Sequence, residues 1–224
     1  MLTTTMVFAM LNVTGIKNSL IGEDIYILGN GPSIKDEDLT KLDNKYSIGL
    51  NASPLLETEF SFKSQYYVLS DTRFISHPDK RAMATTMLSP GSTRIFRKEL
   101  YEYDDEKHKS DTYYVNAIGK NGFSLDLALG FYFGCTTTML AIQVAYYLGC
   151  KRIFLLGNDL TYSSKNPRFY KEYIAQEFDR FTSIQIWNIR NSYNILNEHG
   201  VQLYNCSKQS LLRPYIPFFK AFND

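Results

Sequence analysis

The feature that most constrains the fold is a short apolar run that stops at a glycine-rich turn, DIYILGNGPS, at residues 24–33. Such a run is typical of a buried parallel strand, and the turn marks its carboxyl end, where ligands bind in open α/β sheets. Gly29 and Gly31 would let the backbone approach a phosphate, and Ser33 would cap a following helix whose N-terminus attracts anions. The segment therefore predicts an anion-binding turn, or else a tight turn without a ligand.

Composition narrows the class of protein. The chain has 224 residues, of which 44% are hydrophobic, and this suits one folded domain. Its 24 basic and 23 acidic residues give a net charge of +1, so no nucleic-acid partner is expected. The three cysteines are widely spaced and form no CxxC pair, and the sequence predicts no metal ligands.

Apolar runs alternate with helical patterns along the chain. Strands are predicted at 24–28, 45–50, 65–70, 93–96, 151–156 and 201–204, and helices at 35–42, 136–148 and within 168–198. This alternation predicts an α/β fold with a mostly parallel, Rossmann-like sheet flanked by helices, in a single domain over residues 1–224. We expect a small lid at 160–185, an N-terminal appendage at 1–20 and an irregular surface excursion at 98–121.

The last predicted helix carries an apolar stripe. Its members recur every three to four positions and predict a face turned to the core. They are Ile174, Phe178, Phe181, Ile184 and Trp187.

Small polar residues follow four of the predicted strands, at 29–33, 51–53, 71–72 and 157–159. The carboxyl ends of parallel strands share one edge of a sheet, so these side chains can face a single crevice. Asparagine and aspartate also favour turns, which explains any one of these positions by itself. The four together favour a shared binding site.

Three segments occur in a fixed order: LGNGPSI at 28–34, TTTMLAIQVAYYLGCKRIFLLGNDLTY at 136–162 and VQLYNCSKQSLL at 201–212. They resemble the motifs of the bacterial lipo-oligosaccharide sialyltransferases and their relatives, the MptE-like proteins. The resemblance implies that the donor is CMP-sialic acid and that neither a metal nor another cofactor is required.

The resemblance also implies roles for individual residues. Asn30 and Ser33 would lie near the donor phosphate, Asn51 would contact the donor, and Asp71 would be a polar residue of the pocket. Thr136 and Thr137 would touch the sugar, Asp159 would lie close to the nucleoside, and Tyr162 and Tyr170 would hold the leaving phosphate. The expected donor-binding set is therefore Gly29, Asn30, Gly31, Ser33, Asn51, Thr136, Thr137, Gly157, Asp159 and Tyr170.

The sequence departs from the sialyltransferase pattern at two places. The family's catalytic histidine lies in its lid, and here that region has no histidine before His199. Cys135 and the glycine before it stand where the family has an arginine. Asp71 or Tyr162 would then be the catalytic residue, with neither preferred. Arg168 in the expected lid would reach an anionic substrate or serve as a surface residue.

Two other functions remain open. YYVLSDTRF at 66–74 and GNDLTYSSKNPRFY at 157–170 look more like the MptE-like proteins, whose archaeal namesakes transfer diphosphate from ATP to a hydroxymethylpterin. That chemistry needs Mg²⁺, for which Asp71 and Asp159 are the candidate carboxylates. The missing lid histidine also suits a non-catalytic module that binds a nucleotide-sugar.

The leading prediction is a metal-independent, sialyltransferase-like glycosyltransferase of bacterial surface-polysaccharide biosynthesis. Its partners would be a nucleotide-sugar and a glycan acceptor. We expect it in the cytoplasm or at the inner face of the membrane. Contact with a membrane surface, self-association and the identity of the donor and acceptor stay open.

Overall fold

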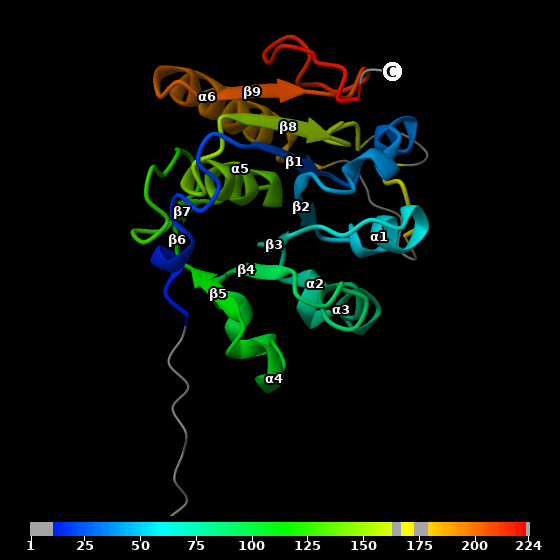
Figure 1. The fold of residues 1–224 in the computed structure, drawn as a ribbon, viewed down its shortest axis with the longest axis vertical. Helices are drawn as coiled ribbons and strands as arrows, with labels where there is room; N and C mark the ends of the chain where they lie inside the picture. The colour runs from blue at the N-terminus through cyan, green and yellow to red at the C-terminus, as the bar shows by residue number, and fades with distance from the viewer. Residues whose placement is uncertain (1–10, 163–166, 173–178, 223–224) are drawn as a thin grey trace, which may run out of the picture.

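The computed structural model describes residues 11–162, 167–172 and 179–222. Within them, seven strands form a sheet in the order β5-β4-β3-β2-β1-β8-β9, and each neighbouring pair is parallel (Figure 1). The strands are β1 (Asp24–Leu28), β2 (Tyr46–Leu50), β3 (Tyr66–Leu69), β4 (Thr93–Arg97), β5 (Thr112–Val115), β8 (Arg152–Leu156) and β9 (Gln202–Asn205). The strand order reverses between β1 and β8, as in a doubly wound fold. The predicted α/β class is confirmed.

The central strands are apolar because both faces of the sheet are covered. In β1, Ile25 and Ile27 belong to the cluster beneath α5 (Thr137–Tyr147), while Tyr26 and Leu28 belong to a cluster on the other face. The helix α6 (Thr182–Glu198) contributes to the first cluster and contacts β9. The buried runs that predicted these strands are therefore buried on both sides.

Shorter elements connect the strands. The helices are α1 (Pro54–Phe60), α2 (Arg73–Ser76), α3 (Pro78–Ala84) and α4 (Glu106–Lys109). Single 3₁₀ turns lie at η1 (Val13–Ile16), η2 (Pro32–Asp36), η3 (Leu39–Leu42) and η4 (Lys98–Tyr103), and β6 (Ala117–Gly119) pairs with β7 (Phe131–Tyr132) outside the main sheet.

Two predictions about local structure are wrong. Residues 35–42 do not form one helix but fall in η2 and η3, because the chain is extended at Glu37, between the two turns. The segment 98–121 is not an irregular excursion, because it contains α4 and the edge strand β5. The charged residues around β5 suit an edge strand, which pairs with β4 and, among the described residues, otherwise makes a single bridge, between Tyr113 and Leu11.

The apolar stripe predicted for the last helix is wrong at Trp187, while Phe181 and Ile184 are only partly buried. Trp187 is 52% exposed, and the buried face of α6 consists of Gln185, Asn188, Ile189, Ser192 and Leu196. Polar side chains face inward because they bind neighbouring loops: Asn188 accepts from the Gly122 amide at 3.1 Å and donates to the Asn121 side chain at 3.0 Å. Ile174 and Phe178 lie outside the described residues.

The expected appendage at 1–20 and lid at 160–185 are described in part. Of the appendage, residues 11–20 pack on the core, where Val13, Ile16 and Leu20 are buried. The Leu20 amide also donates to the Leu148 carbonyl at the end of α5, at 2.7 Å. Of the lid, 163–166 and 173–178 lie outside the described residues. In the part of the chain that is described, no helix has the length and hydropathy of a membrane span.

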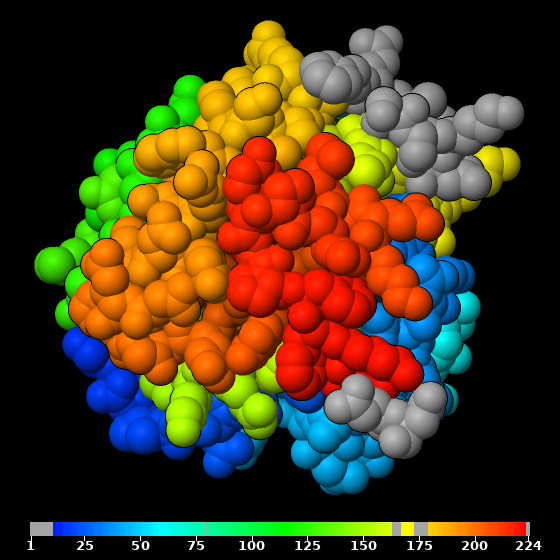
Figure 2. All heavy atoms as spheres, turned by 90° about the horizontal axis from the view of Figure 1, so that it is seen from above, coloured from blue at the N-terminus to red at the C-terminus, as the bar shows by residue number. Residues whose placement is uncertain are grey.

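The C-terminal segment, residues 206–222, covers the β9 edge of the sheet. Seen from above, it lies beside α6 and forms much of that face of the molecule (Figure 2). Phe219 packs against Phe154 and Tyr204 with ring centroids 5.2 and 5.1 Å apart, and Phe222 stacks on Tyr26 at 5.4 Å. The edge itself is occupied by backbone: the Asn205 amide donates to the Pro217 carbonyl at 2.9 Å, and the Asn205 carbonyl accepts from the Phe219 amide at 3.0 Å.

Candidate functional site

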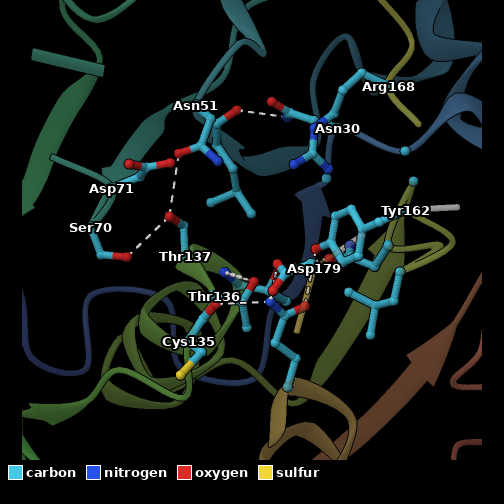
Figure 3. A pocket seen from close by; sticks show the side chains of 18 of the residues that line it. Asn30, Asn51, Ser70, Asp71, Cys135, Thr136, Thr137, Tyr162, Arg168 and Asp179 are labelled. Carbon is cyan, nitrogen blue, oxygen red and sulfur yellow. Dashed lines mark hydrogen bonds between the residues drawn. The ribbon is translucent and has the colours of Figure 1, made fainter. Parts of the chain in front are cut away.

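The carboxyl ends of β1, β2, β3 and β8 surround a cavity of about 210 Å³, with the N-terminus of α5 at its floor (Figure 3). The four polar strand ends thus meet at one place. Ten of the residues expected to form the site line this cavity: Gly29, Asn30, Gly31, Asn51, Asp71, Thr136, Thr137, Gly157, Asp159 and Tyr162. Ser33 and Tyr170 do not line it.

The glycines of the turn allow the ends of β1 and β8 to touch. The Gly29 amide donates to the Leu156 carbonyl at 2.8 Å, and the Gly31 amide donates to the Gly157 carbonyl at 2.7 Å. A Cβ atom on Gly29 would collide with that same Gly157 carbonyl. Close backbone approach is therefore the reason for glycine here.

Asp159 occupies the position at the turn where an outside anion was expected. Its carboxylate accepts the Ser33 amide at 2.9 Å and the Ser33 hydroxyl, and the residue is only 3% exposed. Ser33 is therefore not a helix cap: η2 begins after Gly31 and has no side-chain cap. The turn does bind an anion, but it is a carboxylate supplied by the end of β8.

Asn30 fixes the spacing of two strand ends. Its Nδ2 donates to the Leu50 carbonyl at 2.9 Å, and its Oδ1 accepts from the Ala52 amide at 3.0 Å. Both ends of this buried amide are thereby used within the protein. Through these bonds Asn30 shapes the wall of the cavity. The sequence predicted a position near the donor phosphate for this residue, and not this structural role.

A chain of hydroxyl and amide groups crosses the floor of the cavity at the start of α5. Thr137 donates to Asn51 Oδ1 at 3.3 Å and lies 3.0 Å from the Ser70 hydroxyl (Figure 3). Since the Thr137 hydroxyl has a single hydrogen, it accepts from Ser70 when it donates to Asn51. The Thr136 side chain caps α5 by accepting from the Thr138 amide. The N-terminus of this eleven-residue helix thus faces the cavity with its partial positive charge.

Three residues without the freedom of glycine have left-handed backbones at the cavity. The φ angles are 50° at Asn51 and 59° at both Cys135 and Leu160. Asparagine tolerates this region, whereas leucine does so at a cost. Strained backbone of this kind is held in place by its surroundings and gathers at functional sites.

The wall opposite Asp71 was largely missed by sequence reasoning. Tyr162 donates to Gln185 Oε1 at 3.0 Å, and Gln185 Nε2 donates to Asp179 Oδ2 at 2.9 Å and to the Cys135 carbonyl at 3.0 Å. Arg168, which was an open candidate, lies with its guanidinium 4.9 Å from the centre of the Tyr162 ring. Gln185 and Asp179 carry no motif, so only the three-dimensional structure identifies them.

Asp71 and Tyr162 differ in their protonation. Burial raises the pKa of the Tyr162 hydroxyl, and the charge of Arg168 offsets this only in part. For Asp71 burial also acts to raise the pKa, but the hydrogen bonds and charge of Arg73 outweigh it and hold the pKa below its usual value. The Arg73 guanidinium grips both carboxylate oxygens, with Nη2 2.7 Å from Oδ2. At neutral pH the cavity therefore has an ionised Asp71 and a protonated Tyr162.

Tyr170 lies apart from the cavity. Its ring packs on Phe169, and its hydroxyl lies 3.4 Å from Glu172 Oε1, which also pairs with Lys80 at 3.3 Å. The expected contact of Tyr170 with a donor phosphate would require its hydroxyl to leave this group.

The two carboxylates considered for Mg²⁺ are each held by protein partners. Ser33 binds both oxygens of Asp159, and Arg73 binds both oxygens of Asp71. Over the described ranges, no group of three or more histidine, cysteine, aspartate or glutamate side chains is placed to hold a metal ion. The donor set therefore does not fit the diphosphate-transfer chemistry.

The fold matches solved glycosyltransferase structures. One is the sialyltransferase CstII from Campylobacter jejuni in complex with the substrate analogue cytidine-5'-monophosphate; it has a TM-score of 0.55 and 15% identity over 91% of this chain and 88% of that one. The chain has the fold of a bacterial sialyltransferase. A second is the MAf glycosyltransferase from Magnetospirillum magneticum AMB-1, with a TM-score of 0.59 and 17% identity over 95% of this chain and 38% of that longer one. The resemblance predicted from the three motifs is confirmed at the level of the fold.

No family model matches the sequence, and no curated protein matches it significantly.

Proposed function

We propose that this protein is a glycosyltransferase that moves a sugar from a nucleotide donor, of the CMP-sialic acid type, to a hydroxyl group of a glycan acceptor. The observation that carries the proposal is the polar cavity at the point where the strand order reverses, with the N-terminus of α5 facing into it. The shared fold with a sialyltransferase that was solved with CMP supports the choice of donor.

In this proposal the donor phosphate lies at the start of α5. The helix N-terminus favours a negative group, and Thr136, Thr137 and Asn51 offer polar contacts to the phosphate and sugar. The glycines of the β1 and β8 turns hold these two strand ends together beside the donor site. The nucleoside would lie nearer Gly157 and Asp159, at the end of β8.

The protonation states give each catalytic candidate one role. As the bond between the anomeric carbon and the phosphate oxygen breaks, negative charge grows on the leaving CMP, and the Tyr162 hydroxyl, once it turns from Gln185, can donate its single hydrogen to it. The acceptor oxygen bonds to the anomeric carbon and gives its proton to the ionised Asp71, which acts as general base. No step in this scheme needs a metal ion.

Nucleotide binding tests the donor site directly. CMP in excess EDTA should raise the melting temperature of the full chain, since a ligand at 100 times its Kd stabilises the folded state by about 2.7 kcal/mol. Thr137→Val should reduce this rise, because it removes the hydroxyl between Ser70 and Asn51. Thr58→Val is the matched control: that hydroxyl binds only the Pro54 carbonyl on α1. A response to ATP with Mg²⁺ and none to CMP would contradict the proposal.

Turnover separates an enzyme from a binding module. Incubation with CMP-N-acetylneuraminic acid should release CMP slowly even without an acceptor, detected by mass spectrometry. Tyr162→Phe should slow this release and leave the CMP-induced rise in melting temperature in place. Tight binding of CMP without any release would identify a non-catalytic module instead.

A further inference from the structure

A second cavity lies at the carboxyl ends of β4 and β5. It is an open groove of about 610 Å³ beneath η4. Its lining is rich in tyrosine and glutamate: Thr72, Lys98, Glu99, Tyr101, Glu102, Tyr103, Asn116 and Ala117. Among them, only Thr72 belongs to a segment that the sequence pattern singled out, the polar strand end at 71–72.

At two places in the chain, consecutive residues line the candidate site and this η4 groove. Asp71 lines the candidate site, and the next residue, Thr72, lines the groove. In the same way Arg97 lines the site and Lys98 the groove. Figure 3 shows Asp71 on the side of the cavity away from Tyr162 and Asp179. The groove therefore lies next to the Asp71 side of the cavity, opposite the proposed leaving-group contact.

The chemistry of the groove suits a ligand rich in hydroxyl groups. Tyr103 is 50% exposed and offers an aromatic surface against which the carbon face of a sugar can pack. Glu102 supplies carboxylate oxygens that accept hydroxyl hydrogens, Lys98 supplies a donor, and Glu99 is paired with Arg97 at 2.6 Å. Because the charge of Arg97 offsets that of Glu99, Lys98 and Glu102 leave the groove without an excess of either charge, which suits a neutral ligand.

Buried contacts beneath the groove hold η4 against the sheet. In the segment after η4, Asp104 is fully buried and binds Arg94 of β4, with Nη2 to Oδ2 at 2.9 Å. The Tyr114 hydroxyl of β5 donates to the same carboxylate at 2.7 Å. Leu100 anchors η4 itself in the apolar cluster beneath it. A surface fixed before binding loses little freedom on binding, which favours affinity.

We propose that the η4 groove is the acceptor subsite and that its occupant is a neutral oligosaccharide. The inference rests on the proposed glycosyltransferase function and adds to it the place and class of the acceptor. The sugar chain lies along Tyr103 and Glu102 and presents one hydroxyl to Asp71. That hydroxyl gives its proton to Asp71 as its oxygen bonds to the anomeric carbon and CMP departs with the bonding electrons.

Binding of defined sugars to the full chain tests the inference. Saturation-transfer NMR in the presence of CMP would use lactose, N-acetyllactosamine, maltotriose and chitotriose as neutral probes, with sialyllactose as the anionic comparison. At least one neutral probe should bind, and Tyr103→Ala and Glu102→Gln should each weaken it, by about tenfold for the tyrosine. Tyr215→Ala is the control, since Tyr215 is exposed to a similar degree beside the C-terminal segment.

The outcomes distinguish the inference from the function on which it rests. Weaker sugar binding in both groove variants, with an unchanged CMP-induced rise in melting temperature, supports the groove. Neutral sugar binding that is unaffected by either variant, preference for sialyllactose, or no sugar binding while CMP still binds would overturn the groove and leave the donor site intact. If CMP does not raise the melting temperature of the unaltered protein, the proposed function itself is refuted.

Discussion

At the scale of single residues, Arg73 determines the ionisation of Asp71. Burial by itself would make this carboxyl group harder to ionise, and the two-point grip of Arg73 reverses that effect. Across the cavity, Tyr162 has no such partner charge strong enough to offset its burial, so its pKa lies above the ordinary value. An ionised carboxylate and a protonated hydroxyl thus stand on opposite sides of the cavity at the same pH.

The pH dependence of transfer should follow from these two shifts. The pKa of Asp71 lies below its ordinary 3.8 and that of Tyr162 above its ordinary 10.0, so kcat/KM should be flat between them. Asp71→Asn should lower kcat by about 10²–10⁴-fold, the usual contribution of a general base. CMP binding should be retained.

Arg73→Gln provides the sharper measurement. Without the arginine, burial raises the pKa of Asp71, so the acid limb of the kcat/KM profile should move to higher pH. Arg81→Gln is the control, because Arg81 pairs with Asp105 instead. An acid limb that stays in place in Arg73→Gln would rule out Asp71 as the base.

At the scale of elements, α6 shows how a helix can bury polar groups to build a site. Gln185 connects Tyr162, Asp179 and the Cys135 carbonyl through one amide. Three residues further on, Asn188 holds the loop at 121–122. These contacts override the apolar periodicity, since each buried polar group that lacked a partner would cost free energy.

Two substitutions on α6 should therefore change the free energy of unfolding in the reverse order to that expected from hydrophobicity, with the larger loss at the polar residue. Gln185→Leu should lower the free energy of unfolding by about 1–3 kcal/mol, because it leaves buried partners unpaired. Trp187→Ala should lower it by less than about 1 kcal/mol, because half of that side chain is already in water. Urea unfolding of both variants gives the comparison, and a larger loss for Trp187→Ala would contradict the described packing of α6.

At the scale of the whole molecule, the two halves of the sheet are stabilised differently. On the β8 and β9 side, Phe219 and Phe222 of the C-terminal segment pack on the rings of Phe154 and Tyr26. The β4 and β5 side depends on the buried pair of Arg94 and Asp104, which ties the segment after η4 to the sheet. The proposed acceptor groove lies over this second half.

Replacing an arginine by methionine on each of the two sides should lower the free energy of unfolding by different amounts. Arg94→Met leaves the buried Asp104 without its partner and should lower the free energy of unfolding by about 3–5 kcal/mol. Arg152→Met removes a pair with Asp24 that is largely exposed, and should change it by no more than about 1 kcal/mol. Guanidinium unfolding measures both, and equal losses would show that the Arg94 pair is not buried in solution.

The sequence by itself determined six of the seven strands of the sheet and the position of the cavity. Apolar runs of five residues form buried strands, and a glycine stop marks a carboxyl end, because both depend on neighbours along the chain. The turn at 29–33 was enough to predict where a ligand site would lie, and α5 followed from its own pattern.

Only the tertiary structure decided which groups remain available at that cavity. Ser33 binds Asp159 across 126 residues of sequence, Asn30 binds the end of β2, and α6 turns Gln185 inward where the pattern favoured Trp187. Hydrogen bonds between distant residues depend on how strand ends are placed in space, and no local pattern records that placement. For the same reason the η4 groove, built from the ends of β4 and β5, is visible only in the folded molecule.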